Sequence, residues 1–110
     1  MVRPEVLEQL REFVAERDWS QFHTPANLAK SIVIESAEIL EHFQWDDSFD
    51  REQVLDELAD VLTYALLLAD RLEADASDII LSKLTKTREK YPTELARGTS
   101  EKYDRLHDQA

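Results

Sequence analysis

The sequence predicts an all-α protein, a four-helix-bundle-like subunit formed by a single domain over residues 1–110. The length suits one domain with a real core but not two. Hydrophobic residues make up 43% of the chain, which is ordinary for a folded protein. With one glycine and three prolines, few residues are left to build the turns of a β or α/β fold. Long helices are therefore expected.

The first two helices are predicted from the spacing of apolar residues and from helix-start signals. A first helix is expected over residues 4–18. Its apolar positions recur at helical spacing: Val6, Leu7, Leu10, Phe13 and Val14. After an aromatic connector over residues 19–23, Thr24 suits an N-cap and Pro25 the first helical position. The second helix should continue to about Phe43.

The third helix carries a wide apolar stripe. Asp50 and Gln53 have capping-box spacing, so a helix should start there and run to about Glu73. Its apolar residues cover an arc of roughly 160°. They are Val54, Leu55, Leu58, Val61, Leu62, Ala65, Leu66, Leu68, Ala69 and Leu72. The second helix has a similar arc. Because stripes this wide exceed what one small unit buries, both helices should be central and a homo-oligomer is expected.

A fourth helix and a polar tail complete the chain. Asp75 or Ser77 would cap the helix, and Tyr91 should end it, because a residue that precedes proline is pushed out of the α region. Residues 93–110 are polar, contain the only glycine, and are expected to form an extended tail or arm.

Composition excludes several classes of function. The net charge of −11 disfavours binding of a nucleic-acid polymer, although a bound cation would still admit small phosphate ligands. Without cysteine there is no disulfide, thiolate metal site or cysteine nucleophile. No leader-like apolar segment and no run of membrane-spanning length is present. We therefore expect a cytoplasmic protein with no membrane partner.

Two carboxylate pairs stand at helical spacing beside the apolar stripes. Glu35 and Glu38 share one face of the second helix, as Glu57 and Asp60 share one face of the third. Glu35 lies about 20° from Leu28 on the helical wheel, inside the edge of the apolar arc. Such pairs are often no more than solvated surface. If these two pairs converge between packed helices, however, each close contact costs up to about 4 kcal/mol at an effective dielectric of 20.

A bound divalent cation would offset that repulsion. Four carboxylates without a histidine or cysteine ligand select a hard ion, Mg²⁺ or as a substitute Mn²⁺, rather than Zn²⁺. A di-iron bundle would need histidine three residues after a glutamate. His42 lies four residues after Glu38, and the third helix has no histidine, so the di-iron interpretation fails.

The chain resembles the MazG-like all-α nucleotide pyrophosphohydrolases, and within them the dCTP-pyrophosphatase branch. The family pattern of ExxE, a spacer and ExxD is present as Glu35-Ser-Ala-Glu38 and Glu57-Leu-Ala-Asp60. Further similar segments extend the resemblance over about residues 11–103. They are residues 17–45, 60–64, 83–92, 97–98 and 102–103.

This resemblance implies a homodimer or a dimer of dimers that cleaves a nucleoside triphosphate between the α- and β-phosphates. It implies that the four acidic residues hold Mg²⁺, which binds phosphate oxygens and positions water. Glu38 is our candidate for the catalytic residue that orients or deprotonates that water. A pyrimidine or modified deoxynucleotide is the expected substrate.

The resemblance also implies substrate-binding residues. Trp19, His23 and Trp45 match the pocket that encloses the base, and Tyr64 continues the carboxylate face of the third helix. Three basic residues are candidates for binding the β- and γ-phosphates, although a single basic residue on an acidic protein is often a surface counter-charge: Lys30, Lys83 and Arg88. Thr87 departs from the family, which often has asparagine there, so one polar contact to the phosphates is in question.

Two other functions remain open from the residues alone. One is a non-catalytic helical oligomer that senses nucleotides or binds proteins, and the other is a plain acidic bundle. The sequence predicts neither the base preference nor the number of metal ions.

Overall fold

The computed structural model describes residues 2–102 and 104–105, and every regular element within them is helical. The all-α prediction is therefore confirmed for the described residues. The chain divides into two units, Met1–Asp75 and Ala76–Ala110. The predicted single domain and the packing of four helices in one bundle stay predictions.

The first unit contains three α-helices and a short 3₁₀ turn. They are α1 (Pro4–Glu16), η1 (Ser20–Phe22), α2 (Pro25–Glu41) and α3 (Arg51–Arg71). The predicted first helix ends two residues early, because Asp18 adopts a positive φ of 52°. The second and third helices also end two residues before their predicted limits.

Both predicted helix starts in this unit are confirmed by side-chain caps. The Thr24 hydroxyl accepts a hydrogen bond from the backbone N–H of Asn27 at 3.1 Å. The Asp50 carboxylate accepts from the N–H groups of Glu52 and Gln53 at 3.0 and 3.2 Å. These bonds satisfy N–H groups that have no partner within the helix, and so they fix where α2 and α3 begin.

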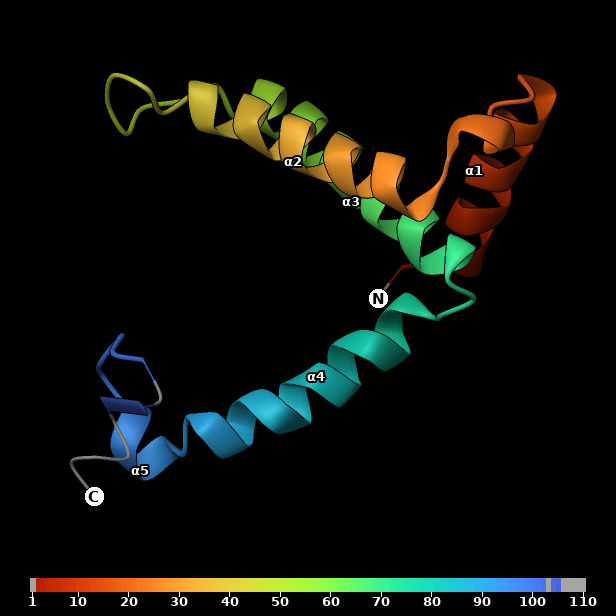
Figure 1. The fold of residues 1–110 in the computed structure, drawn as a ribbon. Helices are drawn as coiled ribbons and strands as arrows, with labels where there is room; N and C mark the ends of the chain where they lie inside the picture. The colour runs from red at the N-terminus through yellow and green to blue at the C-terminus, as the bar shows by residue number, and fades with distance from the viewer. Residues whose placement is uncertain (1, 103, 106–110) are drawn as a thin grey trace. The chain divides into compact units, whose positions relative to one another are not determined.

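The helices α2 and α3 form a hairpin and pack along one another (Figure 1). The chain leaves along α2, turns through the loop over residues 42–50, and returns along α3. Within the loop, the rings of Phe43 and Phe49 lie 5.1 Å apart. The backbone N–H of Ser48 donates to the Asp46 carboxylate at 2.8 Å, which stabilises the turn. The hairpin places one face of α2 opposite one face of α3.

The core of this unit lies where α1 meets the hairpin. Val14 from α1, Leu28 from α2 and Leu67 from α3 are its buried centre, and Leu28 is only 1% exposed. Leu10, Tyr64 and Leu68 pack around them. Leu67 falls outside the stripe predicted for the third helix. It is buried because α1 also contacts α3, so α3 is covered on more than the side that faces α2.

Much of the apolar stripe is left exposed in a single chain. Val33 and Leu40 of α2 are each 69% exposed, and Leu62 of α3 is 54% exposed. Exposed apolar surface on this scale is typical of a protein–protein interface. The structure thus agrees with the prediction that α2 and α3 carry more apolar surface than one chain buries. The homo-oligomer itself stays a prediction.

The second unit contains α4 (Ala76–Lys90) and the short α5 (Thr93–Ala96). Because α4 begins at Ala76, Asp75 rather than Ser77 occupies the capping position. The prediction of an extended tail was wrong for α5. Pro92 has a φ of −58° and accepts backbone hydrogen bonds from residues 95 and 96, so it starts another helical turn. Among the described residues, no helix is both long and apolar enough to cross a membrane.

Candidate active site

The α2–α3 hairpin brings the two predicted carboxylate pairs together. Glu35 and Glu38 lie on α2, and Glu57 and Asp60 lie on α3. The pKa of Glu35 is raised, first by burial, then by a hydrogen bond to Glu38, and then by the negative charges of Glu38, Asp60 and Glu57. Because the charges of all three other carboxylates act on Glu35, we call these four side chains the acidic quartet. Their assignment as a metal site stays a prediction.

His42 contacts one member of the acidic quartet. It follows the last residue of α2, and its Nε2 contacts Oε2 of Glu57. The two side chains are 20% and 25% exposed. The Oε2 atom itself is buried and accepts no well-aligned hydrogen bond. Buried carboxylate oxygens normally accept a hydrogen bond, so Oε2 of Glu57 can still accept one from a donor.

The chemistry of the acidic quartet fits a hard divalent cation. Its donors are carboxylate oxygens, and burial, a hydrogen bond to Glu38 and the neighbouring negative charges raise the pKa of Glu35. A bound cation would offset the repulsion among these charges. Within the described residues, no three histidine, aspartate or glutamate side chains are already grouped closely enough to hold an ion. The carboxylates would therefore have to rotate inward to bind it.

A cavity of about 340 Å³ adjoins the acidic quartet. It brings together three residues predicted to bind substrate, Trp19, His23 and Tyr64, with Asp60 of the quartet. The remaining lining residues come from α1 and α3: Leu10, Phe13, Val14, Thr63 and Leu67. These five were not predicted as cavity residues. The apolar face of the first helix was the only signal for Leu10, Phe13 and Val14, and it does not reveal which helix they contact.

The Trp19 ring is held by its neighbours at the edge of this cavity. Its centroid lies 5.5 Å from that of Phe13 in an edge-to-face arrangement, and the guanidinium of Arg17 lies 3.8 Å from the Phe13 centroid. Trp19 remains 43% exposed. An indole fixed in this way offers a stacking surface without losing much side-chain freedom on binding.

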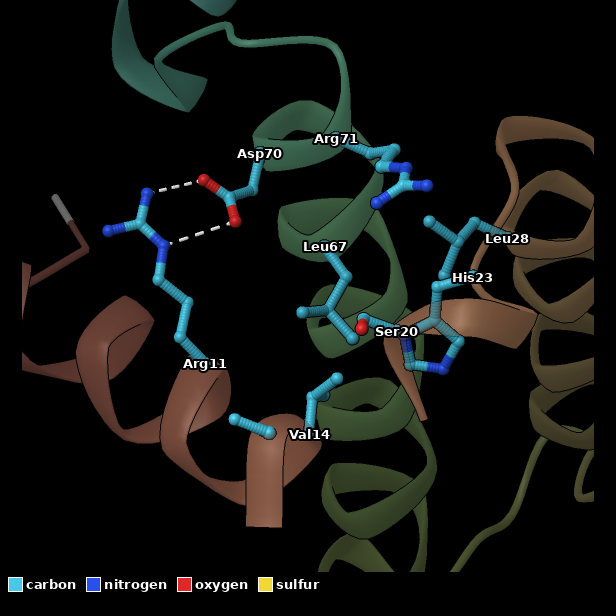
Figure 2. A pocket seen from close by; sticks show the side chains of 9 residues that line it. Arg11, Val14, Ser20, His23, Leu28, Leu67, Asp70 and Arg71 are labelled. Atoms are coloured by element: carbon cyan, nitrogen blue, oxygen red, sulfur yellow. Dashed lines mark hydrogen bonds and ion pairs between the residues drawn. The ribbon is translucent and has the colours of Figure 1, made fainter. Parts of the chain in front are cut away.

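A second cavity, of about 150 Å³, shares His23, Val14 and Leu67 with the first (Figure 2). Figure 2 shows Arg11 of α1 reaching Asp70 of α3 through two hydrogen bonds. The Nε–Oδ2 bond is 3.1 Å long. The Arg11 guanidinium lowers the pKa of Asp70 and closes one side of the cavity. This ion pair fastens α1 to α3 and so helps to fix the walls of both cavities.

Several predicted substrate-binding residues are not in these cavities. Trp45 is 88% exposed on the loop after α2, whereas Trp19 precedes α2. The 17-residue helix between them is about 25 Å long, so the two indoles of one chain cannot enclose the same base. Lys30 lies exposed on α2.

The other two predicted phosphate ligands, Lys83 and Arg88, belong to α4 in the second unit, and their role stays a prediction. The hydroxyl of Thr87 donates to the backbone carbonyl of Lys83 at 3.0 Å. Its proton is therefore not available to a phosphate in this conformation. Tyr103, part of the resemblance, lies outside the described residues.

Known proteins resemble this chain over most of its length. The model of the MazG-like family matches residues 30–106. Mouse dCTP pyrophosphatase 1 is 40% identical over 114 aligned positions, covering 91% of this chain and 67% of the mouse protein. The human enzyme is 41% identical with the same coverage. The crystal structure of a pyrophosphatase from Archaeoglobus fulgidus superposes with a TM-score of 0.73 at 45% identity, covering 80% of this chain and 90% of that one. The chain belongs to the MazG-like family.

Proposed function

We propose that this protein is a divalent-metal-dependent pyrophosphohydrolase that converts a nucleoside triphosphate to its monophosphate and pyrophosphate. The relatives are a dCTP pyrophosphatase and a pyrophosphatase, which supports hydrolysis of a triphosphate chain. Mg²⁺ is the proposed ion, with Mn²⁺ as a substitute, because the acidic quartet offers oxygen donors only. Its proposed task is to remove dCTP-like or modified pyrimidine deoxynucleotides from the cytoplasmic nucleotide pool.

The observation that carries the proposal is the position of Asp60. This residue belongs to the acidic quartet and also lines the 340 Å³ cavity beside Trp19 and Tyr64. A site for a nucleoside and a site for its phosphates must lie next to each other in this way, because the base and the triphosphate are attached to the same sugar. The cavity volume lies within the range of small-molecule sites, about 300–1,000 Å³.

Each residue then has a specific task. A bound Mg²⁺ would neutralise phosphate charge and activate water. Glu38, half-buried on α2, would accept a proton from the attacking water, while Glu35, Glu57 and Asp60 supply the remaining negative charge. Trp19 would stack on the base, which contributes about 1–3 kcal/mol per base in nucleic-acid binders.

The polar groups at the cavity wall would orient the nucleoside. His23 and Tyr64 both present groups that donate or accept hydrogen bonds, in an otherwise mostly apolar lining. We propose that Lys30, Lys83 and Arg88 neutralise the outer phosphates, whose charge the acidic protein would otherwise repel.

We also propose that the working enzyme is a homodimer or a dimer of dimers. The exposed stripe of Val33, Leu40 and Leu62 gives an apolar surface for a second copy. The exposed Trp45 would close the base pocket of that copy, because it cannot reach the pocket of its own chain. Sedimentation of the purified protein over a range of concentrations tests the association.

The activity is tested by measuring pyrophosphate release from canonical and modified nucleotides with Mg²⁺. We expect the monophosphate and pyrophosphate from pyrimidine deoxynucleotides, identified by chromatography. Glu38→Gln and Asp60→Asn should abolish turnover with retained helicity, whereas Glu41→Gln, an exposed neighbour on α2, should not. Calorimetric binding of a nucleotide that is never hydrolysed would favour a non-catalytic sensor. Release of orthophosphate would contradict cleavage between the α- and β-phosphates.

A further inference from the structure

The contact between His42 and Glu57 joins the end of α2 to the acidic quartet. Nε2 of His42 is paired with Oε2 of Glu57, and both side chains are at least three-quarters covered. In the part of the chain that the structure describes, Oε2 of Glu57 is the one buried side-chain nitrogen or oxygen without a hydrogen bond. His42 therefore lies next to a buried oxygen that lacks a hydrogen-bond donor, which is costly to leave unsatisfied.

The position of His42 along α2 explains this contact. His42 lies four residues after Glu38 and seven after Glu35, so all three side chains share one face of the helix. Glu57 faces them from α3 across the hairpin. An imidazole at this place is too well covered to be a surface counter-charge, and it meets the quartet from the side of the loop over residues 42–50.

Hydrogen-bond chemistry restricts what the imidazole can do. An ionised carboxylate only accepts hydrogen bonds, and a neutral imidazole with its proton on Nε2 can donate one to it. A nitrogen that carries a proton has no lone pair for a metal ion. If His42 donates to Oε2, the other oxygen of Glu57 would be the one to face the ion.

We propose that His42 is a positioning residue, which holds Oε2 of Glu57 by a donated hydrogen bond so that the other carboxylate oxygen points to the metal ion. The inference rests on the proposed metal site. It assigns His42 to the group of residues that orient metal ligands, whose loss commonly weakens metal affinity or activity by about 10–100-fold.

The test is a titration of the whole protein with Mn²⁺, followed by electron paramagnetic resonance of the free ion. His42→Leu removes the donor and should weaken Mn²⁺ binding by about 10–100-fold. His42→Gln keeps an N–H donor of similar reach and should stay within a few-fold of the wild type. Glu41→Gln, one residue earlier and exposed, controls for a change at the helix end and should bind as the wild type does.

Each other outcome has a definite meaning. Equal affinity in the wild type and His42→Leu would overturn the inference while leaving the metal site intact. Equal losses in the Leu and Gln variants would overturn it too, because a donated hydrogen bond would then not be what matters. A wild type that binds no Mn²⁺ would instead refute the proposed metal site. Circular dichroism confirms that each variant is folded.

A spectroscopic measurement separates positioning from direct ligation. If His42 bound the ion, electron spin echo modulation of bound Mn²⁺ would show coupling to an imidazole nitrogen that disappears in His42→Gln. We expect no such coupling from His42. Observing it would overturn the positioning role and make His42 a ligand.

Discussion

Replacing Glu35 by Gln should stabilise the metal-free protein and at the same time abolish its stabilisation by metal. Glu35 is half-buried, and three carboxylates act on it: Glu38 on the same helix, and Glu57 and Asp60 on α3. A like-charge pair on one helix costs a few tenths of a kcal/mol, and partly screened pairs across the hairpin cost a similar amount each. Together these repulsions should lower the free energy of unfolding by about 1 kcal/mol.

The expected changes in melting temperature follow from this repulsion energy. For a chain of this length, about 1 kcal/mol raises the melting temperature by about 4 °C. In the wild type, Mg²⁺ at 100 times its Kd adds about 2.7 kcal/mol, or about 10 °C. Glu35→Gln should thus melt above the wild type in a chelator and below it in saturating Mg²⁺.

Thermal unfolding followed by circular dichroism, at one fixed protein concentration, measures both differences. Glu41→Gln is the matched control, because it removes the same charge from the exposed side of the same helix. If Glu35→Gln and Glu41→Gln melt together in chelator, the carboxylates do not repel one another as the structure indicates. If Glu35→Gln keeps the full response to Mg²⁺, Glu35 does not bind the ion.

Three further predictions concern the surroundings of the site. Asp70→Asn should lower the free energy of unfolding at neutral pH by less than about 1 kcal/mol, since its Arg11 partner is exposed. The hydrogen bonds from Arg11 lower the pKa of Asp70, so the stability that Asp70 contributes is present above its unfolded-state pKa near 4 and is lost as pH falls through the lower folded-state pKa. Urea unfolding should therefore show a difference between wild type and Asp70→Asn at neutral pH that disappears at acid pH. A difference that stays constant with pH would contradict this prediction. Trp19→Ala should raise KM for the preferred nucleotide by about 10-fold with a smaller change in kcat, whereas an unchanged KM in steady-state assays would remove Trp19 from the base pocket. Leu28→Ala should cost about 2–5 kcal/mol in urea unfolding because Leu28 is only 1% exposed, and a loss below 1 kcal/mol would show that the small core can collapse around the gap.

Local signals made the helices and the facing positions of the two carboxylate pairs predictable. Thr24 and Asp50 cap the helices that they were expected to cap, because capping depends on residues within one turn. The two carboxylate pairs lie on facing helices because helical spacing and a short connection leave α2 and α3 few alternatives to lying side by side. The helix ends were less well predicted, since fraying and a positive φ at Asp18 leave little trace in the sequence.

Contacts between distant segments were not predictable. Phe13 and Thr63 line the cavity only because α1 crosses α3, and the sequence gives no register for that crossing. Leu67 was missed for the same reason. His42 was considered only as a di-iron ligand and set aside, because its spacing from Glu38 is wrong for that site. Its contact with Glu57 depends on the hairpin register, which a single helix does not encode.

The hairpin also bears on how quickly the site can form. All four carboxylates and His42 come from α2, α3 and the start of the loop between them, so the proposed metal site needs closure of one short loop only. Contacts of low sequence separation form early in folding. The mutual repulsion of the carboxylates opposes this step, and a cation relieves it. Mg²⁺ should consequently act on the folding rate of the chain as well as on its stability, and the apoprotein should pass a higher folding barrier than the protein that folds with the ion present.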